Sequence, residues 1–143
     1  WKRASVVSRH PHAPADAPAW LEEARAQLDA PGSYLTFERA EDEPTSFRLG
    51  EGWTRIGRSA RADLRLDDST VSRRHALVVL TPDGDLRALD DRSLNGLFVN
   101  GEHVEWTALA DGDELEIGRF KLYVLAAVST ALSPAFASPT IWQ

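Results

Sequence analysis

The 143-residue sequence contains no cysteine. It therefore has no disulfide framework, no thiolate zinc site and no cysteine nucleophile, and a reducing compartment is permitted. No apolar run reaches the roughly 18 residues that a membrane-spanning helix needs. Because Trp1–Pro18 also lacks the apolar core of a secretory signal, we expect a cytoplasmic protein without a membrane span. The first residue is not Met, so we expect the chain to be part of a longer protein.

Basic residues are outnumbered, and the net charge is −6 at pH 7. This charge disfavours nonspecific binding to nucleic acid or to anionic membranes, because both need a positive surface field. The segment from Arg55 to His75 nevertheless holds six arginines and three carboxylates, a net +3 that leaves −9 for the rest of the chain. The sequence therefore predicts a local anion site. Contact of the arginines with RNA or DNA phosphates is a lesser alternative, and we expect no nucleic-acid partner.

The chain divides into four segments of different composition. Residues 1–16 are polar and are expected to be flexible, and residues 17–31 are expected to form a short amphipathic helix capped by Asp16. Residues 32–126 contain short alternating or β-branched runs separated by turn residues, which is typical of an all-β sandwich. Residues 127–143 are rich in Ser, Ala and Pro and are expected to be a tail.

Ten strands are predicted within the sandwich segment. Their ranges are Tyr34–Arg39, Ser46–Leu49, Trp53–Gly57, Asp63–Leu66, Ala76–Leu80, Leu86–Asp90, Leu97–Val99, His103–Val104, Glu114–Ile117 and Lys121–Leu125.

Apolar positions along both sheets are expected to build the core, and the helix is expected to pack Trp20 and Leu28 on the sandwich. Trp53 and Trp106 are interpreted as core or shielding residues. The predicted core residues are Leu35, Phe37, Ile56, Leu64, Leu66, Val71, Ala76, Val78, Leu89, Phe98, Val99, Leu115, Ile117, Leu122 and Val124.

Three groups of polar residues lie in or beside the predicted loops. The first is Ile-Gly-Arg at 56–58, the second is Val-Ser-Arg-Arg-His at 71–75, and the third is Ser-Leu-Asn-Gly at 93–96, followed by Val-Asn-Gly at 99–101. Arginine offers a planar fork to phosphate oxygens, serine offers a neutral donor, and glycine lets backbone amides approach an anion. If these groups share one edge of the sandwich, as we expect, they form a phosphate-recognition site.

These motifs resemble the forkhead-associated (FHA) domain in order and spacing, over about Trp53 to Leu125. The resemblance implies an FHA-like β sandwich of about ten to eleven strands that binds phosphothreonine peptides through loops at one end. It also implies a role in Ser/Thr kinase signalling, with a kinase or its substrate as partner. Two further segments, Asp63–Asp67 and Asp111–Leu115, also resemble FHA motifs.

The resemblance carries over residue by residue to the phosphopeptide-binding positions. Arg58 and Ser72 resemble the pair that binds the phosphate, and Arg73 stands where another phosphate or peptide contact is often supplied. Asn95 resembles the asparagine that holds the peptide backbone, and Ser93 is assigned to the same binding set.

Other positions are expected to shape the loops. Gly57, His75 and Gly96 resemble loop-shaping residues, and Asn100 resembles one that braces the binding loops beside the threonine methyl. Leu94 is a departure, because several family members have a threonine there whose hydroxyl contacts the phosphate. One phosphate donor is therefore in question.

The sequence favours a binding module over an enzyme. Ser72 and His75 lack a Gly-x-Ser-x-Gly elbow and an oxyanion loop, and we expect no catalytic residue. His10 and His12 lack further metal ligands, so neither a metal nor a cofactor is expected.

Two alternatives to phosphopeptide binding remain. The sandwich could be a phosphorylation-independent scaffold that uses another face. It could also be self-regulated, with the pocket occupied in cis or in a neighbouring chain by a phosphorylated Lys2–Ser5 segment, by Thr130 or by the Ser138–Thr140 tail. The sequence leaves the oligomeric state open.

Overall fold

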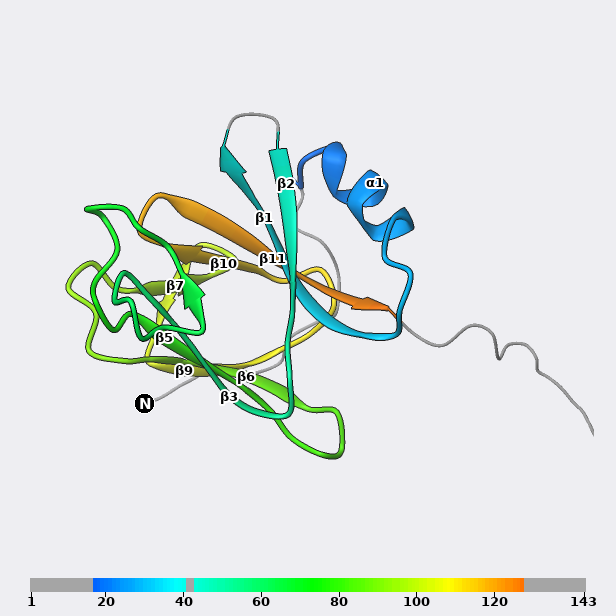
Figure 1. Cartoon of the computed structure of the whole chain (residues 1–143). Coiled ribbons are helices and arrows are strands. Elements are labelled where there is room, and N and C mark those ends of the chain that lie inside the picture. Colours follow the sequence, from blue (N-terminus) through cyan, green and yellow to red (C-terminus); the bar gives the residue numbers. More distant parts are fainter. Residues whose placement is uncertain (1–16, 41–42, 128–143) are drawn as a thin grey trace, which may run out of the picture.

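Two β-sheets face each other, with one short helix beside them (Figure 1). The structure is a computed structural model that describes residues 17–40 and 43–127. The predicted flexible lead, the Asp16 cap, the candidate phosphorylation segments and nearly all of the predicted tail lie outside these residues. The described part contains eleven strands, which confirms the all-β sandwich. Within this part, no helix is long and apolar enough to cross a membrane.

The first sheet has six strands in the order β2-β1-β11-β10-β7-β8, and the second has five in the order β4-β3-β5-β6-β9. All strand pairs are antiparallel except β3 with β4. The strands of the first sheet are β1 (Gly32–Ala40), β2 (Glu43–Arg48), β7 (Leu97–Val99), β8 (Glu102–Val104), β10 (Glu114–Ile117) and β11 (Phe120–Ala127). Those of the second are β3 (Gly52–Gly57), β4 (Leu64–Arg65), β5 (Ala76–Leu80), β6 (Leu86–Asp90) and β9 (Trp106–Leu109).

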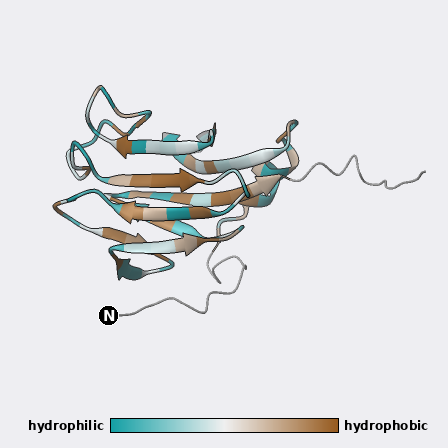
Figure 2. Ribbon diagram, turned by 90° about the horizontal axis from the view of Figure 1, so that it is seen from below, coloured by the Kyte–Doolittle hydropathy of each residue, from teal (hydrophilic) through white to brown (hydrophobic). Residues whose placement is uncertain are grey.

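Hydrophobic and hydrophilic residues alternate along several strands (Figure 2). Because successive side chains of a strand point to opposite faces, the apolar ones form a buried core cluster between the sheets. Most of the predicted core is buried there, but Leu89 and Phe98 are not. On β6 the buried residues are Leu86 and Ala88, so Leu89 faces outward. Phe98 faces outward because its neighbours on β7 face inward. The prediction placed Phe98 and Val99 on one face, which the two-residue period of a strand forbids.

The strand β9 (Trp106–Leu109) was not predicted. It follows β8 after a single residue, Glu105, although β8 belongs to the first sheet and β9 to the second. No Gly, Pro or Asn separates the two strands, so the usual turn signal is missing at the point where the chain changes sheet.

The prediction that Trp53 and Trp106 are core or shielding residues is wrong. Their relative exposures are 63% and 60%. Each lies on an outward-facing position of the second sheet, because the buried positions of their strands are Thr54 and Thr107. Large aromatic rings were assigned to the interior by composition, although the strand period places them outside.

The helix α1 (Trp20–Ala26) covers the outer face of the first sheet. Leu21 and Ala24 are buried against Tyr34, Tyr123 and Leu125, which point away from the core between the sheets. The predicted packing of Trp20 and Leu28 is confirmed, because both side chains are partly buried against this cluster.

The helix is shorter than the predicted 17–31 segment. Its N-cap position is Ala19, which makes no side-chain capping bond, and the predicted cap residue Asp16 lies outside the described residues. Tertiary contacts hold it instead. Arg25 donates two hydrogen bonds of 3.1 Å each to the carboxylate of Asp111, and the ring of Trp20 meets Tyr123 edge-on with centroids 5.9 Å apart. Short helices depend on such packing, because propensity alone is insufficient at this length.

We predict that Leu21→Ala lowers the free energy of unfolding by about 2–5 kcal/mol, because it removes a buried side chain between the helix and the first sheet. Denaturant unfolding measures this change, with the exposed Glu23→Ala as the control. Equal stability of the two variants would contradict the packing described here.

Candidate functional site

Three connections gather at the end of the sandwich on the left of Figure 1. They are the β3–β4 loop (58–63), the β4–β5 loop (66–75) and the β6–β7 loop (91–96). They carry all but two of the predicted site residues. Of these two, Gly57 is the last residue of β3 and immediately precedes the β3–β4 loop, whereas Asn100 lies elsewhere.

The β3–β4 and β4–β5 loops are joined through their backbones at Gly57. The amide of Arg58 donates to the carbonyl of Ser72 at 2.9 Å, and the amide of Ser59 donates to the carbonyl of Arg73 at 3.2 Å. A Cβ atom on Gly57 would lie 2.1 Å from the Arg73 carbonyl oxygen. Only glycine allows this approach, so the predicted loop-shaping role has a steric basis.

Arg58 is half-buried, and its side chain is held through the guanidinium Nε. Its Nε donates to the carbonyl of Val71 at 3.0 Å, while no hydrogen bond from either Nη is found in the described part of the chain. Its own carbonyl accepts a 2.9 Å hydrogen bond from Arg65 Nε. The guanidinium is therefore oriented by the protein, and its terminal nitrogens are available to a ligand.

Ser72 links the β4–β5 and β6–β7 loops. Its hydroxyl oxygen accepts a hydrogen bond from the backbone amide of Leu94 at 2.8 Å, which leaves the hydroxyl hydrogen free to donate. Arg58 is thus bound to two consecutive carbonyls of the β4–β5 loop, through its Nε to Val71 and through its backbone amide to Ser72.

His75 is fully buried and connects the same two loops. Its Nδ1 accepts from the amide of Ser72 at 3.0 Å, so Nε2 carries the proton and donates to the carbonyl of Gly96 at 2.8 Å. Both ring nitrogens are thus used in fixing backbone. His75 therefore holds the two loops together and has no ring nitrogen left for proton transfer.

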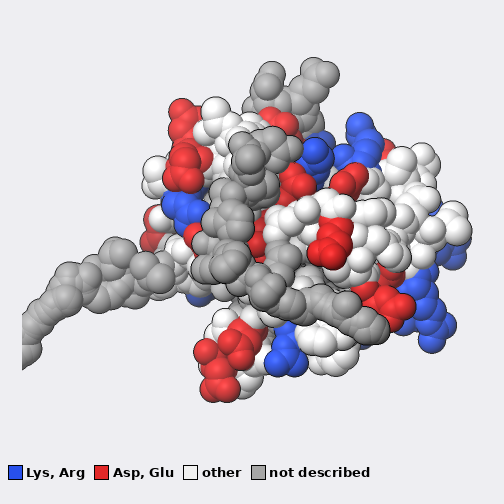
Figure 3. Space-filling view, turned by 180° about the vertical axis from the view of Figure 1, so that it is seen from behind, with Lys and Arg blue, Asp and Glu red and all other residues white. Residues whose placement is uncertain are grey.

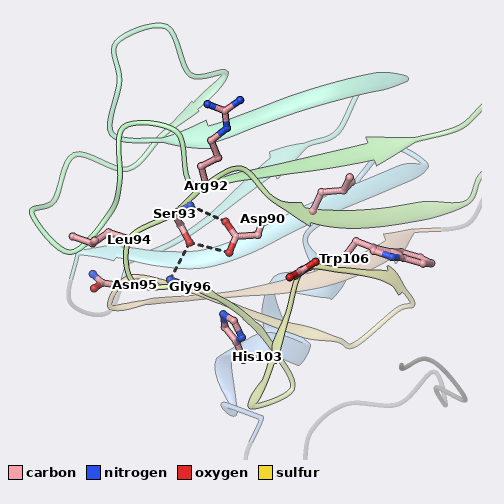
Figure 4. Close-up of a pocket in the computed structure, with 10 residues that line it drawn as sticks. Asp90, Arg92, Ser93, Leu94, Asn95, Gly96, His103 and Trp106 are labelled. Atoms are coloured by element: carbon pink, nitrogen blue, oxygen red, sulfur yellow. Dashed lines mark hydrogen bonds between the residues drawn. The ribbon is translucent and has the colours of Figure 1, made fainter. Parts of the chain in front are cut away.

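The β6–β7 loop is closed by Ser93, as Figure 4 shows. The Ser93 hydroxyl donates to Asp90 at 3.0 Å and accepts from the amide of Gly96 at 2.9 Å, and the Ser93 amide donates to Asp90 at 2.8 Å. The hydroxyl hydrogen is therefore already used. The assignment of Ser93 to ligand contact is corrected to bracing of the loop.

Asn95 spans from the β6–β7 loop to the β4–β5 loop. Its Nδ2 donates to the carbonyl of Thr70 at 3.0 Å, while the side chain stays exposed. Its Oδ1 and second N–H hydrogen remain open to a ligand. The neighbouring Leu94 is 89% exposed and carries no side-chain donor, although its backbone amide holds Ser72.

Asn100 lies away from the three loops, which corrects the expectation that it braces them. It follows the last residue of β7, about 13 Å along the strand from the end of the β6–β7 loop. Its Nδ2 donates to Asp113 at 3.0 Å, and its Oδ1 accepts from the amide of Glu114 at 2.9 Å. Asn100 therefore anchors the β7–β8 turn to the start of β10, with a φ of 53° that asparagine tolerates.

The two adjacent arginines of the β4–β5 loop differ in their partners. Arg74 forms a two-point ion pair with Asp91, at 3.1 and 2.9 Å, and this hydrogen bonding raises the pKa of Arg74. The side chain of Arg73 is exposed and has no hydrogen-bond or ion-pair partner among the described residues. Arg73 is therefore the member of the pair that is free to meet a ligand.

Comparison with known proteins adds independent information. A model of the FHA domain family matches residues 54–118. The chain is 39% identical over 99 residues to the oxoglutarate dehydrogenase inhibitor of Corynebacterium efficiens, covering 69% of each protein. This chain belongs to the FHA domain family. The FHA domain is also 41% identical over 98 residues to the glycogen accumulation regulator GarA of Mycolicibacterium smegmatis, covering 68% of this chain and 61% of that protein. It therefore spans about three fifths of the length of that regulator.

Solved structures agree with the family. The FhaA FHA domain, solved in complex with the intracellular domain of Rv3910, has a TM-score of 0.60 and 32% identity, over 65% of this chain and 99% of that one. An FHA domain from a study of phosphothreonine-dependent interactions has a TM-score of 0.59 and 33% identity, over 64% of this chain and 95% of that one.

One network in this FHA domain was missed from the sequence. Asp68 accepts hydrogen bonds from the amide and the hydroxyl of Thr70, and its other oxygen accepts from Arg119 Nε at 2.9 Å. The Thr70 hydroxyl in turn accepts from the amide of Arg119 at 3.0 Å. The network ties the β4–β5 loop to the β10–β11 turn. The Asp-x-Thr spacing is a turn signal that could have indicated its local half.

These bonds hold the pKa of Asp68 below its usual value of 3.8, first through the Thr70 hydroxyl, then through the Thr70 amide and Arg119. Because the folded pKa is the lower one, the stabilisation is present above about pH 4 and is lost as the pH falls through the folded value. We predict that the Thr70 amide resonance titrates with a midpoint below 3.8. The transition should vanish in Asp68→Asn and persist in Asp83→Asn. A midpoint at or above the usual value would contradict the network.

We predict that Gly57→Ala weakens both folding and ligand binding in the FHA domain. The added methyl group overlaps the Arg73 carbonyl and forces the two loops apart, at a cost of about 1–3 kcal/mol in unfolding free energy. Thermal unfolding measures the change. Gly50→Ala is the matched control, because nothing lies within 4 Å of a Cβ there. If both variants unfold at the same temperature, the close approach of Gly57 to the Arg73 carbonyl does not constrain the fold.

Proposed function

We propose that this FHA domain binds phosphothreonine-containing peptides through Arg58, Ser72 and the loops around them. One observation supports the proposal. Arg58 is fixed to the β4–β5 loop through its Nε while neither Nη has a hydrogen-bond partner among the described residues, and Ser72 of that loop keeps its hydroxyl hydrogen free to donate. A guanidinium fork and a neutral donor on adjacent loops match the oxygens of a phosphate monoester.

Charge favours the same ligand. A phosphothreonine carries about −1.5 to −2 charges at neutral pH, and hydrogen bonds to charged groups contribute roughly 1.5 to 3 kcal/mol each. Of Arg58, Arg73 and Arg74, the first two have no carboxylate partner among the described residues, whereas Arg74 is paired with Asp91. On the face that Figure 3 shows, acidic and basic side chains are interspersed without a continuous basic band, as expected for local anion binding rather than nucleic-acid binding.

The remaining groups suit a peptide rather than free phosphate. Asn95 offers Oδ1 and one N–H hydrogen at the mouth of the loops, the pair of groups that a peptide backbone can satisfy. A leucine at position 94 adds no phosphate donor, so Arg58, Ser72 and Arg73 carry the phosphate in this proposal.

The module recruits its partner without catalysis. Its relatives are named as a regulator and an inhibitor, and His75 has both nitrogens engaged in structure. The partner is a Ser/Thr protein kinase or a kinase substrate, and a cytoplasmic location stays a prediction. No cofactor or metal takes part in the proposed binding.

The two alternatives have distinct outcomes. Equal affinity for phosphorylated and unphosphorylated peptides would support a phosphorylation-independent scaffold. Self-regulation would appear as a loss of peptide affinity after kinase treatment of the chain, with the modified site found by mass spectrometry.

We predict that Arg58→Ala weakens binding of the best peptide from an oriented phosphothreonine library by about ten- to hundredfold, because it removes charge-assisted hydrogen bonds. Calorimetry measures the change. Arg39→Ala removes an exposed arginine from β1 and serves as the control. Unchanged affinity in Arg58→Ala, or equal losses in both variants, would overturn the assignment.

A further inference from the structure

The outer face of the second sheet is unusually apolar. Neighbouring strands pair Trp53 with Val79, Val79 with Arg87, and Arg87 with Ala108. Residues directly opposite each other point to the same side of a sheet, and this side is outward because the row next to it, through Thr54, is buried. Three of the four side chains in this outer row are therefore apolar.

A second outer row lies two residues further along the strands. It consists of Arg55, Leu77, Leu89 and Trp106. Together the two rows form what we term the two-tryptophan face, with the tryptophans at opposite corners. Leu77, Val79 and Leu89 are only partly buried.

Within the described part of the chain, no helix or strand covers this face, in contrast to the outer face of the first sheet. There, α1 buries Tyr34, Tyr123 and Leu125, whereas no helix or strand of residues 17–40 and 43–127 packs outside the second sheet. Isolated exposed apolar residues need no explanation, but a contiguous patch with two tryptophans marks an interaction surface.

The two-tryptophan face is continuous with the loops of the proposed phosphopeptide site. A hollow of about 540 Å³ is lined by Leu89 of β6 and Trp106 of β9 and by the β6–β7 loop residues Ser93 and Asn95. Figure 4 shows Trp106 across this hollow from the loop. A chain held at Arg58 and Asn95 can therefore continue over the hollow onto the sheet.

The charge of the face selects the chemistry of its partner. Arg55 and Arg87 are exposed and have no ion-pair partner among the described residues, and none of the eight outer positions is a carboxylate. The face therefore combines an apolar surface with two uncompensated positive charges. Its complement is a segment that carries large apolar and acidic side chains.

A second copy of this chain fits less well. Four strands about 4.8 Å apart and two rows about 7 Å apart give a face on the order of 300 Å². Stable dimers bury about 800 Å² per partner. Packing two such faces would also bring arginines of both copies onto one surface without carboxylates among the face positions. A small apolar face serves better as an auxiliary contact beside a strong anchor.

We infer that the two-tryptophan face is a second docking surface for the phosphorylated partner, which lays an apolar and acidic segment flanking its phosphothreonine across the sheet. The inference rests on the proposed function, because the phosphate supplies the anchor. In this inference, the two-tryptophan face distinguishes among partners that all carry a phosphothreonine.

The test uses a peptide library with a fixed phosphothreonine core of about seven residues and about ten randomised residues on either side, enough to cross the face when extended at about 3.3 Å per residue. The whole chain should select extensions enriched in Asp, Glu and large apolar residues. A selected peptide should bind about tenfold or more tightly than its core alone, and Trp53→Ser combined with Trp106→Ser should abolish this gain.

Arg87→Glu should reduce the gain, while Lys121→Glu, the same charge change on the first sheet, should leave it intact. Affinity for the core alone should be unchanged in all these variants. Core binding without any gain from extensions overturns this inference alone, whereas a failure of the core to bind overturns the proposed function as well.

Other occupants give different results. A dimer in sedimentation that the double tryptophan variant dissociates would assign the face to a second copy and overturn the inference. A large drop in melting temperature in that variant would show that another part of the chain covers the face, with the same consequence. The inference requires a monomer whose melting temperature the two substitutions leave nearly unchanged.

Discussion

The buried imidazole of His75 is the constraint on which the recognition site depends. It accepts a hydrogen bond from the β4–β5 loop and donates one to the β6–β7 loop, so that two connections far apart in sequence share one ring. Ser72 and Leu94 reinforce the junction, and Gly57 lets the β3–β4 loop approach it. Because these groups are fixed before a ligand arrives, binding costs little ordering of the loops.

The outer faces of the two sheets differ in what covers them within the described residues. The helix α1 packs on the outer face of the first sheet and is held there by the Arg25–Asp111 ion pair, and this packing contributes stability. The second sheet leaves two tryptophans exposed beside the loops. A phosphate anchor gives affinity for every phosphothreonine alike, and an adjacent apolar surface is what can distinguish one carrier from another.

The sequence predicted the sandwich well, because alternation and turn residues are local signals, and motif resemblance indicated Arg58, Ser72 and His75. The sequence could not show whether Leu89 points inward or outward, since the adjacent Ala88 and Leu89 of β6 are both apolar. The strand β9 lacked a turn signal, because the chain changes sheets within one residue. The sequence also could not show which serine hydroxyl keeps a free hydrogen, because the hydrogen bond from Ser93 to Asp90 is defined only by the folded loop.

The central claim is that one arginine and one serine from separate loops meet the same phosphate. A crystal structure of this chain with a phosphothreonine peptide tests it most directly. The account predicts phosphate oxygens within about 2.7–3.2 Å of both an Nη of Arg58 and the hydroxyl of Ser72. A phosphate seated elsewhere, or touching only one of the two, would contradict it.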